Sequence, residues 1–220
     1  QSILLKMILQ RTKPKLIILN IDENSLYESN ITYDRLQDII PYYSDFPEII
    51  KPFISMKSNL IALRLFFKSY QYNSTLVHAI KYYFSPQKDY KGYLPLYEKM
   101  KPIKPNKTNV TSNKIKNLDK VFIEALNSFI SASKELDFQL IFVQSPNLLF
   151  KDFSGNASLN KVKLLSKQAD IPFIDFSNNN NFINKFDLFY DTTHLNNEGA
   201  HLFSNIIADK IKNDNILLKY

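Results

Sequence analysis

The sequence predicts an α/β protein, a three-layer α/β/α fold around a parallel sheet. Short runs of branched apolar residues occur at Lys15–Ile21, Phe138–Gln144 and Pro172–Phe176, and such runs are typical of strands that are buried on both faces. A stretch with helical spacing of apolar residues precedes each run. Repeated helix-then-strand units place their strands in parallel and cover both faces of the sheet with helices.

The predicted helices have recognisable beginnings and apolar faces. Ser2 is expected to cap the first helix, whose apolar residues lead into the first strand. The helices before the second and third strands are expected at Leu118–Leu136 and Ser158–Ala169. The last helix is expected to begin at Asn196, a residue type that caps helices well.

The chain of 220 residues is expected to form a single domain, residues 1–220. Residues 33–84 contain no clear strand, and their aromatic-rich stretches around 60–70 and 76–84 predict a helical insertion. Residues 86–116 are rich in Pro, Lys and Asn, a composition that predicts a loop.

Composition excludes several functions. The chain has three glycines, far apart, and no cysteine, which excludes glycine-rich nucleotide loops, the G-x-S-x-G nucleophile elbow and thiolate metal sites. The net charge of +7 comes mostly from dispersed lysines, so we expect no nucleic-acid partner. No apolar run is long enough to cross a bilayer, and we expect membrane association only through a segment absent from these residues.

Asp191 and His194 are the candidate catalytic residues. A carboxylate three residues before a histidine, on a loop before the last helix, can hold the imidazole by Nδ1 and leave Nε2 as a general base. The alternative is a histidine bonded to Asp191 only for structure. We expect His201 to be solvent-exposed and His78 to be a packed or surface residue, with no metal and no cofactor.

The block Asp191-x-x-His194-Leu195-Asn196-x-x-Gly199-Ala200 resembles the last conserved block of SGNH/GDSL hydrolases. It is most similar to their extracytoplasmic acyltransferase-like branch, which includes DltD-like and alginate O-acetylation-like proteins. The resemblance implies a flavodoxin-like fold, the Asp-His part of a Ser-His-Asp triad, and ester hydrolysis or O-acyl transfer on an acylated glycan or cell-envelope polymer. It also implies an extracytoplasmic location, periplasmic or membrane-anchored.

The rest of the chain resembles this branch less closely. The run Gly92-Tyr93-Leu94-Pro95 resembles a Gly-aromatic-x-Pro element of the branch, and Asn24 matches one position of its G-x-N-D block, which implies an oxyanion donor. The family's Ser-bearing G-D-S or G-S-S turn has no counterpart in these residues. We therefore expect a part of a longer enzyme; the alternative is a non-catalytic SGNH-like module that binds glycan or protein.

Overall fold

The computed structural model describes residues 1–55, 80–81, 83–85, 92–102 and 116–213. The chain divides into two compact units. One unit combines Gln1–Pro14 with Glu28–Lys88, and the other combines Lys15–Tyr27 with Asp89–Tyr220. The expectation that residues 1–220 form one domain stays a prediction.

The second unit contains a parallel sheet of three strands in the order β1-β2-β3, as predicted. The strands are β1 (Leu16–Asn20), β2 (Gln139–Gln144) and β3 (Phe173–Asp175). Within the described residues, β1 pairs with β2 along one side only. Its Ile18 side chain is 44% exposed, whereas β2 is buried from Leu140 to its end.

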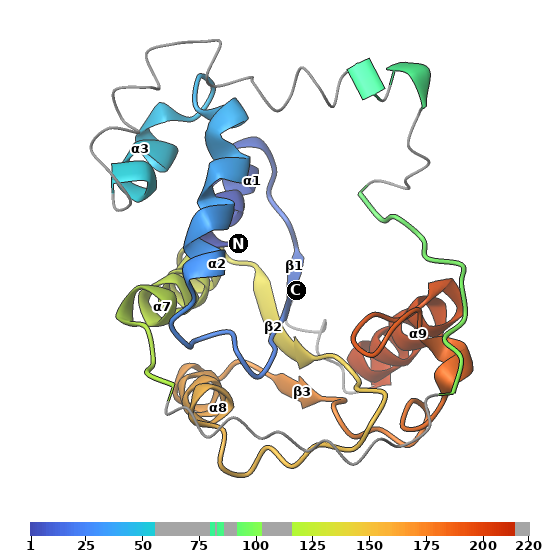
Figure 1. Cartoon of the computed structure of the whole chain (residues 1–220). Helices are drawn as coiled ribbons and strands as arrows, with labels where there is room; N and C mark the ends of the chain where they lie inside the picture. The colour runs from blue at the N-terminus through green and yellow to red at the C-terminus, as the bar shows by residue number, and fades with distance from the viewer. Residues whose placement is uncertain (56–79, 82, 86–91, 103–115, 214–220) are drawn as a thin grey trace. The chain divides into compact units, whose positions relative to one another are not determined.

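Helices cover both faces of this sheet, which confirms the predicted α/β class (Figure 1). On one face lie α7 (Lys120–Glu135) and α8 (Ala157–Ala169), and on the other lies α9 (Asn197–Asn213). Alternate side chains of β2 point to opposite faces. Ile141 and Val143 accordingly pack with Ile211 of α9.

Side chains cap these helices at the positions where the backbone leaves N–H groups without an intrahelical partner. The Asp119 carboxylate accepts from the Val121 N–H before α7, and the Asn156 amide oxygen accepts from the Leu159 N–H before α8. Asp170 ends α8 with a left-handed φ of 57°. Each boundary lies within two residues of the predicted one.

The first unit is helical in its described part. It contains α1 (Ser2–Arg11), α2 (Asn30–Asp34), the 3-10 helix η1 (Arg35–Tyr42) and α3 (Pro47–Ser55). Residues of α1, η1 and α3, with Phe46 between the last two, form a core of buried apolar side chains: Ile3, Met7, Ile39, Ile40, Phe46 and Ile50. The predicted cap at Ser2 is wrong, because the Gln1 carbonyl accepts from the Leu5 N–H and makes Gln1 the cap residue.

The expected insertion at 33–84 is described only in part. Residues 80, 81, 83 and 84 are helical, and the expected helix around 60–70 lies outside the described residues. Residues 92–102 form neither helix nor strand beyond an isolated bridge, and residues 86–91 and 103–115 of the predicted loop lie outside the described residues. In the part of the chain that the structure describes, no helix is both long and apolar enough to cross a membrane.

Candidate active site

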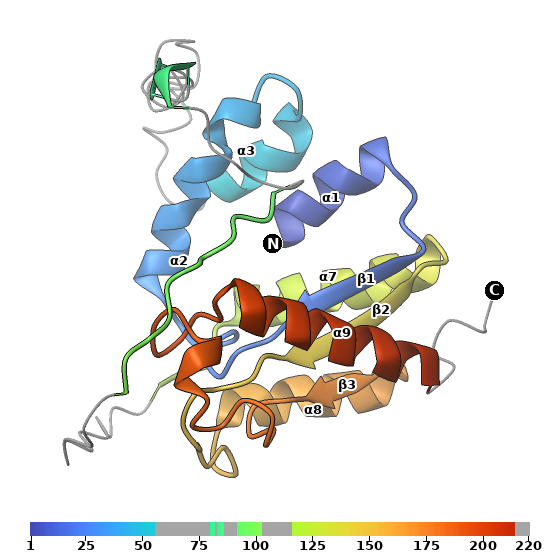
Figure 2. The same cartoon turned by 90° about the vertical axis from the view of Figure 1, so that its right-hand side faces the viewer.

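Asp191 and His194 lie on a short hairpin that precedes α9. Phe189 and Leu195 form an antiparallel bridge at its base. The Tyr190 N–H donates to the His194 carbonyl at 2.8 Å and closes the turn. Figure 2 shows that α9 begins at the end of the sheet where the strand arrowheads lie, so the hairpin belongs to the carboxyl edge. Ligands of open parallel sheets commonly bind at this edge.

The Asp191 carboxylate gathers four donors from the next three residues. Its Oδ1 accepts from the Thr193 N–H at 2.8 Å, the Thr193 hydroxyl at 2.9 Å and the His194 N–H at 2.8 Å. Its Oδ2 lies 2.8 Å from His194 Nδ1. An aspartate that bonds the backbone two residues ahead is a usual turn former, so the local sequence itself builds the contact.

These donors fix the charge state of Asp191. Burial on its own would raise the pKa of the carboxyl, but the hydrogen bonds from Thr193 and His194 outweigh it and hold the pKa far below its ordinary value. An ionised carboxylate only accepts hydrogen bonds, so Nδ1 of His194 carries the hydrogen that is shared with it. In the neutral imidazole this leaves the lone pair on Nε2, as a general base requires.

The imidazole is open to solvent. The side chain of His194 is 66% exposed and that of Asp191 is 44% exposed. No hydrogen bond from the described part of the chain reaches Nε2, and the Thr193 hydroxyl lies on the Nδ1 side, 3.1 Å from that nitrogen. The pair is therefore accessible to a substrate, and the described residues provide no serine bonded to it.

Asn196 fixes the start of α9 and is itself almost fully buried, with 1% exposure. Its amide oxygen accepts from the Gly199 N–H at 3.0 Å, as predicted for a cap, and its Nδ2 donates to the Asp187 carbonyl at 2.7 Å. A Cβ atom at Gly199 would collide with the Leu188 carbonyl oxygen. Only glycine allows the first turn of α9 to lie this close to the chain before the hairpin.

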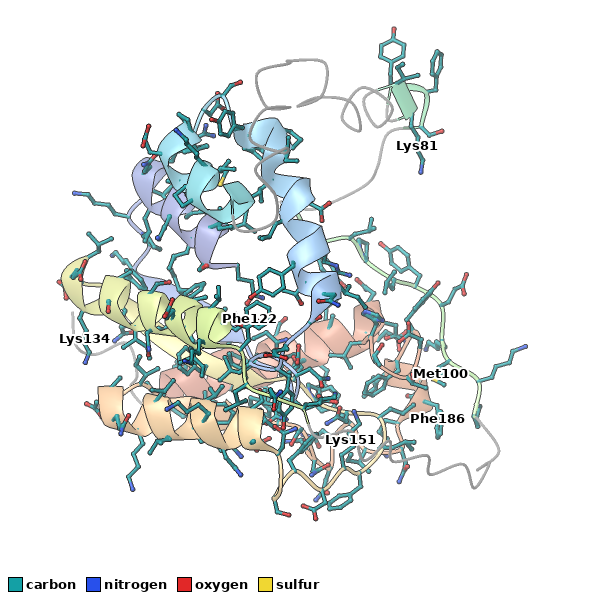
Figure 3. All side chains as sticks on the ribbon, turned by 60° about the vertical axis from the view of Figure 1, so that its left-hand side comes forward. Lys81, Met100, Phe122, Lys134, Lys151 and Phe186 are labelled. Atoms are coloured by element: carbon teal, nitrogen blue, oxygen red, sulfur yellow. The ribbon has the colours of Figure 1, made fainter. Side chains whose placement is uncertain are left out.

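A segment from an earlier part of the chain runs along this block; we call residues 93–100 the strap. It passes the start of α9 (green in Figure 2). The Leu96 carbonyl accepts from the Asn197 N–H at 2.6 Å, and the Met100 N–H donates to the Phe189 carbonyl at 2.8 Å. Met100 also packs against the cluster of Leu148, Phe182 and Phe189, as does Phe186 (both labelled in Figure 3).

Asn24 lies after β1, in a turn where its N–H donates to the Asp22 carboxylate at 2.6 Å. Its amide oxygen accepts from the Lys116 ammonium at 2.7 Å. Within the described residues no hydrogen bond joins Asn24 to Asp191 or His194, so its role as an oxyanion donor stays a prediction.

Sequence reasoning missed two parts of this site. The Thr193 hydroxyl was detectable, since an Asp-x-Thr sequence is typical of a side-chain turn. The strap was not detectable as a partner of the hairpin, although Gly92-Tyr93-Leu94-Pro95 was singled out as a motif.

Only one of the other two histidines lies within the described residues. His201 is exposed on α9, as expected, and His78 lies outside the described residues. Among the residues that the structure describes, no group of three or more His, Cys, Asp or Glu side chains could hold a metal ion.

No protein-family model, curated protein or solved structure matches this chain.

Proposed function

We propose that Asp191 and His194 are the acid-base pair of an SGNH-type ester hydrolase or O-acyltransferase. The observation that carries the proposal is the 2.8 Å contact between Asp191 Oδ2 and His194 Nδ1, in a histidine whose side chain is mostly exposed at the carboxyl edge of the sheet. In a triad the carboxylate holds the imidazole in one tautomer and stabilises the imidazolium that forms.

The proposed reaction uses His194 first as a general base and then as a general acid. His194 Nε2 accepts the proton of a nucleophilic hydroxyl while that oxygen attacks the ester carbonyl carbon. The imidazolium then gives the proton to the leaving alcohol oxygen, and the acyl group stays on the nucleophile until water or an acceptor hydroxyl takes it. By the resemblance, the nucleophile is a serine in a G-D-S or G-S-S turn and the substrate is an acylated glycan or envelope polymer.

The test uses the product of the complete reading frame. We expect it to release acetate from p-nitrophenyl acetate and from an O-acetylated polysaccharide. Asp191→Asn should lower turnover by about 10⁴, because the imidazole then adopts the wrong tautomer. His194→Ala should abolish activity, whereas His201→Ala, an exposed histidine on α9, should leave it unchanged. Activity that survives His194→Ala would refute the proposal.

The 220-residue chain provides a second measurement. By the resemblance, these 220 residues lack the Ser-bearing turn. Loss of a triad nucleophile costs on the order of 10⁶ in turnover, so we expect this chain to be almost inactive on the same esters. Saturable hydrolysis by it that His194→Ala abolishes would place the nucleophile within these residues.

The second candidate is a non-catalytic SGNH-like module that binds glycan or protein. The absence of a described hydroxyl bonded to Nε2 favours it. Glycan binding by the complete product without any ester cleavage, and with Asp191→Asn binding equally well, would support this candidate over the enzyme.

A further inference from the structure

The strap contacts both ends of the segment that carries Asp191 and His194. At one end the Met100 N–H donates to the carbonyl of Phe189, which forms the base of the hairpin with Leu195. At the other end the Leu96 carbonyl accepts from the Asn197 N–H, which belongs to the first turn of α9. That N–H has no partner within its own helix.

Side chains reinforce the backbone contacts at the start of α9. The Tyr93 hydroxyl donates to the Asn197 amide oxygen at 3.1 Å. The Lys99 ammonium lies 2.8 Å from the Glu198 carboxylate, but both side chains are more than half exposed. Such an exposed pair contributes little stability, so the strap is held by the two backbone bonds, the Tyr93 bond and the packing of Met100.

The hairpin needs this support for a geometric reason. The bonds between Asp191, Thr193 and His194 are local, so they orient the imidazole relative to the hairpin but not relative to the sheet edge. The direction of Nε2 therefore depends on how the two ends of the hairpin are held. A misplacement of about 1 Å in a catalytic group can reduce the rate about 10²-fold.

We propose that the strap is a positioning element for the Asp191–His194 pair and that Tyr93 is its principal positioning side chain. The inference rests on the proposed function of that pair. Tyr93 does not touch the imidazole; it acts through Asn197 and the start of α9.

The test replaces single hydroxyl groups. Tyr93→Phe removes the donor to Asn197 and keeps the ring, and Tyr97→Phe is the matched control, because Tyr97 lies on the same strap and is 70% exposed. ¹⁵N NMR of the His194 ring nitrogens reports the imidazole directly, and amide exchange at Asn197 reports the strap contact. Exchange at Ile141 reports the stability of the sheet.

We expect Tyr93→Phe to shift the His194 ring signals and to speed Asn197 exchange about two- to tenfold, the effect of losing one hydrogen bond. Tyr97→Phe should change neither, and Ile141 exchange should stay the same in both variants. If Tyr93 only stabilised the fold, Tyr93→Phe would speed amide exchange at Ile141 and leave the His194 ring signals unchanged. That result would overturn the proposal.

Asn197→Ala keeps the inference falsifiable if Tyr93→Phe fails to fold. It removes the acceptor of the same bond, so the same shift of the His194 signals is expected from it. The double variant should then add nothing further, as for two partners in one contact. Additive effects of the two substitutions would contradict a shared contact.

These measurements need no substrate. The positioning role of the strap and the proposed ester reaction can therefore be refuted independently of each other. Strap variants that shift the His194 signals, together with a product of the complete reading frame that cleaves no ester, would refute the reaction and leave the positioning role. Unchanged signals in a protein whose activity depends on His194 would refute the positioning role alone.

Discussion

Replacing Asn196 by alanine is expected to destabilise the start of α9 and to loosen the candidate site. The substitution removes two hydrogen bonds at once, the one accepted from the Gly199 N–H and the one donated to the Asp187 carbonyl. It also replaces a side chain that is only 1% exposed. The loss therefore combines a helix cap with a polar group left unpaired.

The two contributions can be estimated separately. Replacing an Asn cap by alanine costs about 1 kcal/mol. Asp187 is an exposed residue, so loss of the bond to its carbonyl costs the net value of an ordinary hydrogen bond, about 0.5–1.5 kcal/mol. We therefore expect the free energy of unfolding to fall by about 1.5–2.5 kcal/mol. For a chain of this size each kcal/mol lowers Tm by about 2–4 °C.

Asn156→Ala is the matched control, because Asn156 caps α8 with the same pair of bonds. Its amide oxygen accepts from the Leu159 N–H at 2.8 Å, and its Nδ2 donates to the Glu23 carbonyl at 3.1 Å. It should also destabilise the protein, but its bonds reach α8 and the turn after β1 and not the hairpin. Only the change at Asn196 should shift the ¹⁵N signals of the His194 ring.

Urea unfolding followed by circular dichroism gives the change in stability from the midpoint, provided the slope is unchanged. Amide exchange along β2 gives the same quantity for the sheet, independently of the helical unit. A loss below about 1 kcal/mol for Asn196→Ala would mean that the Asp187 carbonyl finds another partner. Equal shifts of the His194 signals in both variants would refute the link between the cap and the site.

Two further changes test the packing and the charges. Gly199→Ala should cost about 1–3 kcal/mol because its Cβ meets the Leu188 carbonyl oxygen, whereas Gly155→Ala, with open space around it, should stay within about 0.5 kcal/mol in the same urea assay. Burial would raise the pKa of Glu23, but its hydrogen bond to Lys151 lowers it overall. The carboxylate should therefore stabilise the fold above its unfolded pKa of about 4.3 and lose this effect as pH falls through the lower folded value. Glu23→Gln should accordingly reduce the difference between the urea midpoints at pH 7 and pH 3, and an unchanged difference would contradict this account.

The sequence could predict the elements whose causes are local. The three strands follow from continuous apolar runs, and Asn196 is recognisable as a cap because its partner, the Gly199 N–H, lies three residues ahead. The contact between Asp191 and His194 is equally local, since both belong to one turn. The cap was predicted at Ser2, but the first carbonyl to accept a helical hydrogen bond is that of Gln1. Residue type alone does not decide which of two adjacent residues is the cap.

The strap could not be predicted because its contacts are distant in sequence. Tyr93 and Asn197 are 104 positions apart, and no sequence pattern around either residue indicates the other as its partner. The bonds from Leu96 and Met100 involve only backbone groups. Any non-proline residue offers such groups, so no residue type marks the contact.

The division of roles at the start of α9 is the physical reason to prefer a functional role for His194 over a structural one. Asn196 caps the helix, and Gly199 allows the helix to approach the Leu188 carbonyl. The Asn197 N–H donates to the Leu96 carbonyl. None of these contacts involves the imidazole of His194. The imidazole adds little buried surface, since it is 66% exposed. Ordering an exposed side chain by a hydrogen bond to a carboxylate brings little net stability in water. What the arrangement does provide is an exposed imidazole that the Asp191 carboxylate holds by Nδ1, and an oriented, accessible imidazole is what acid-base catalysis uses.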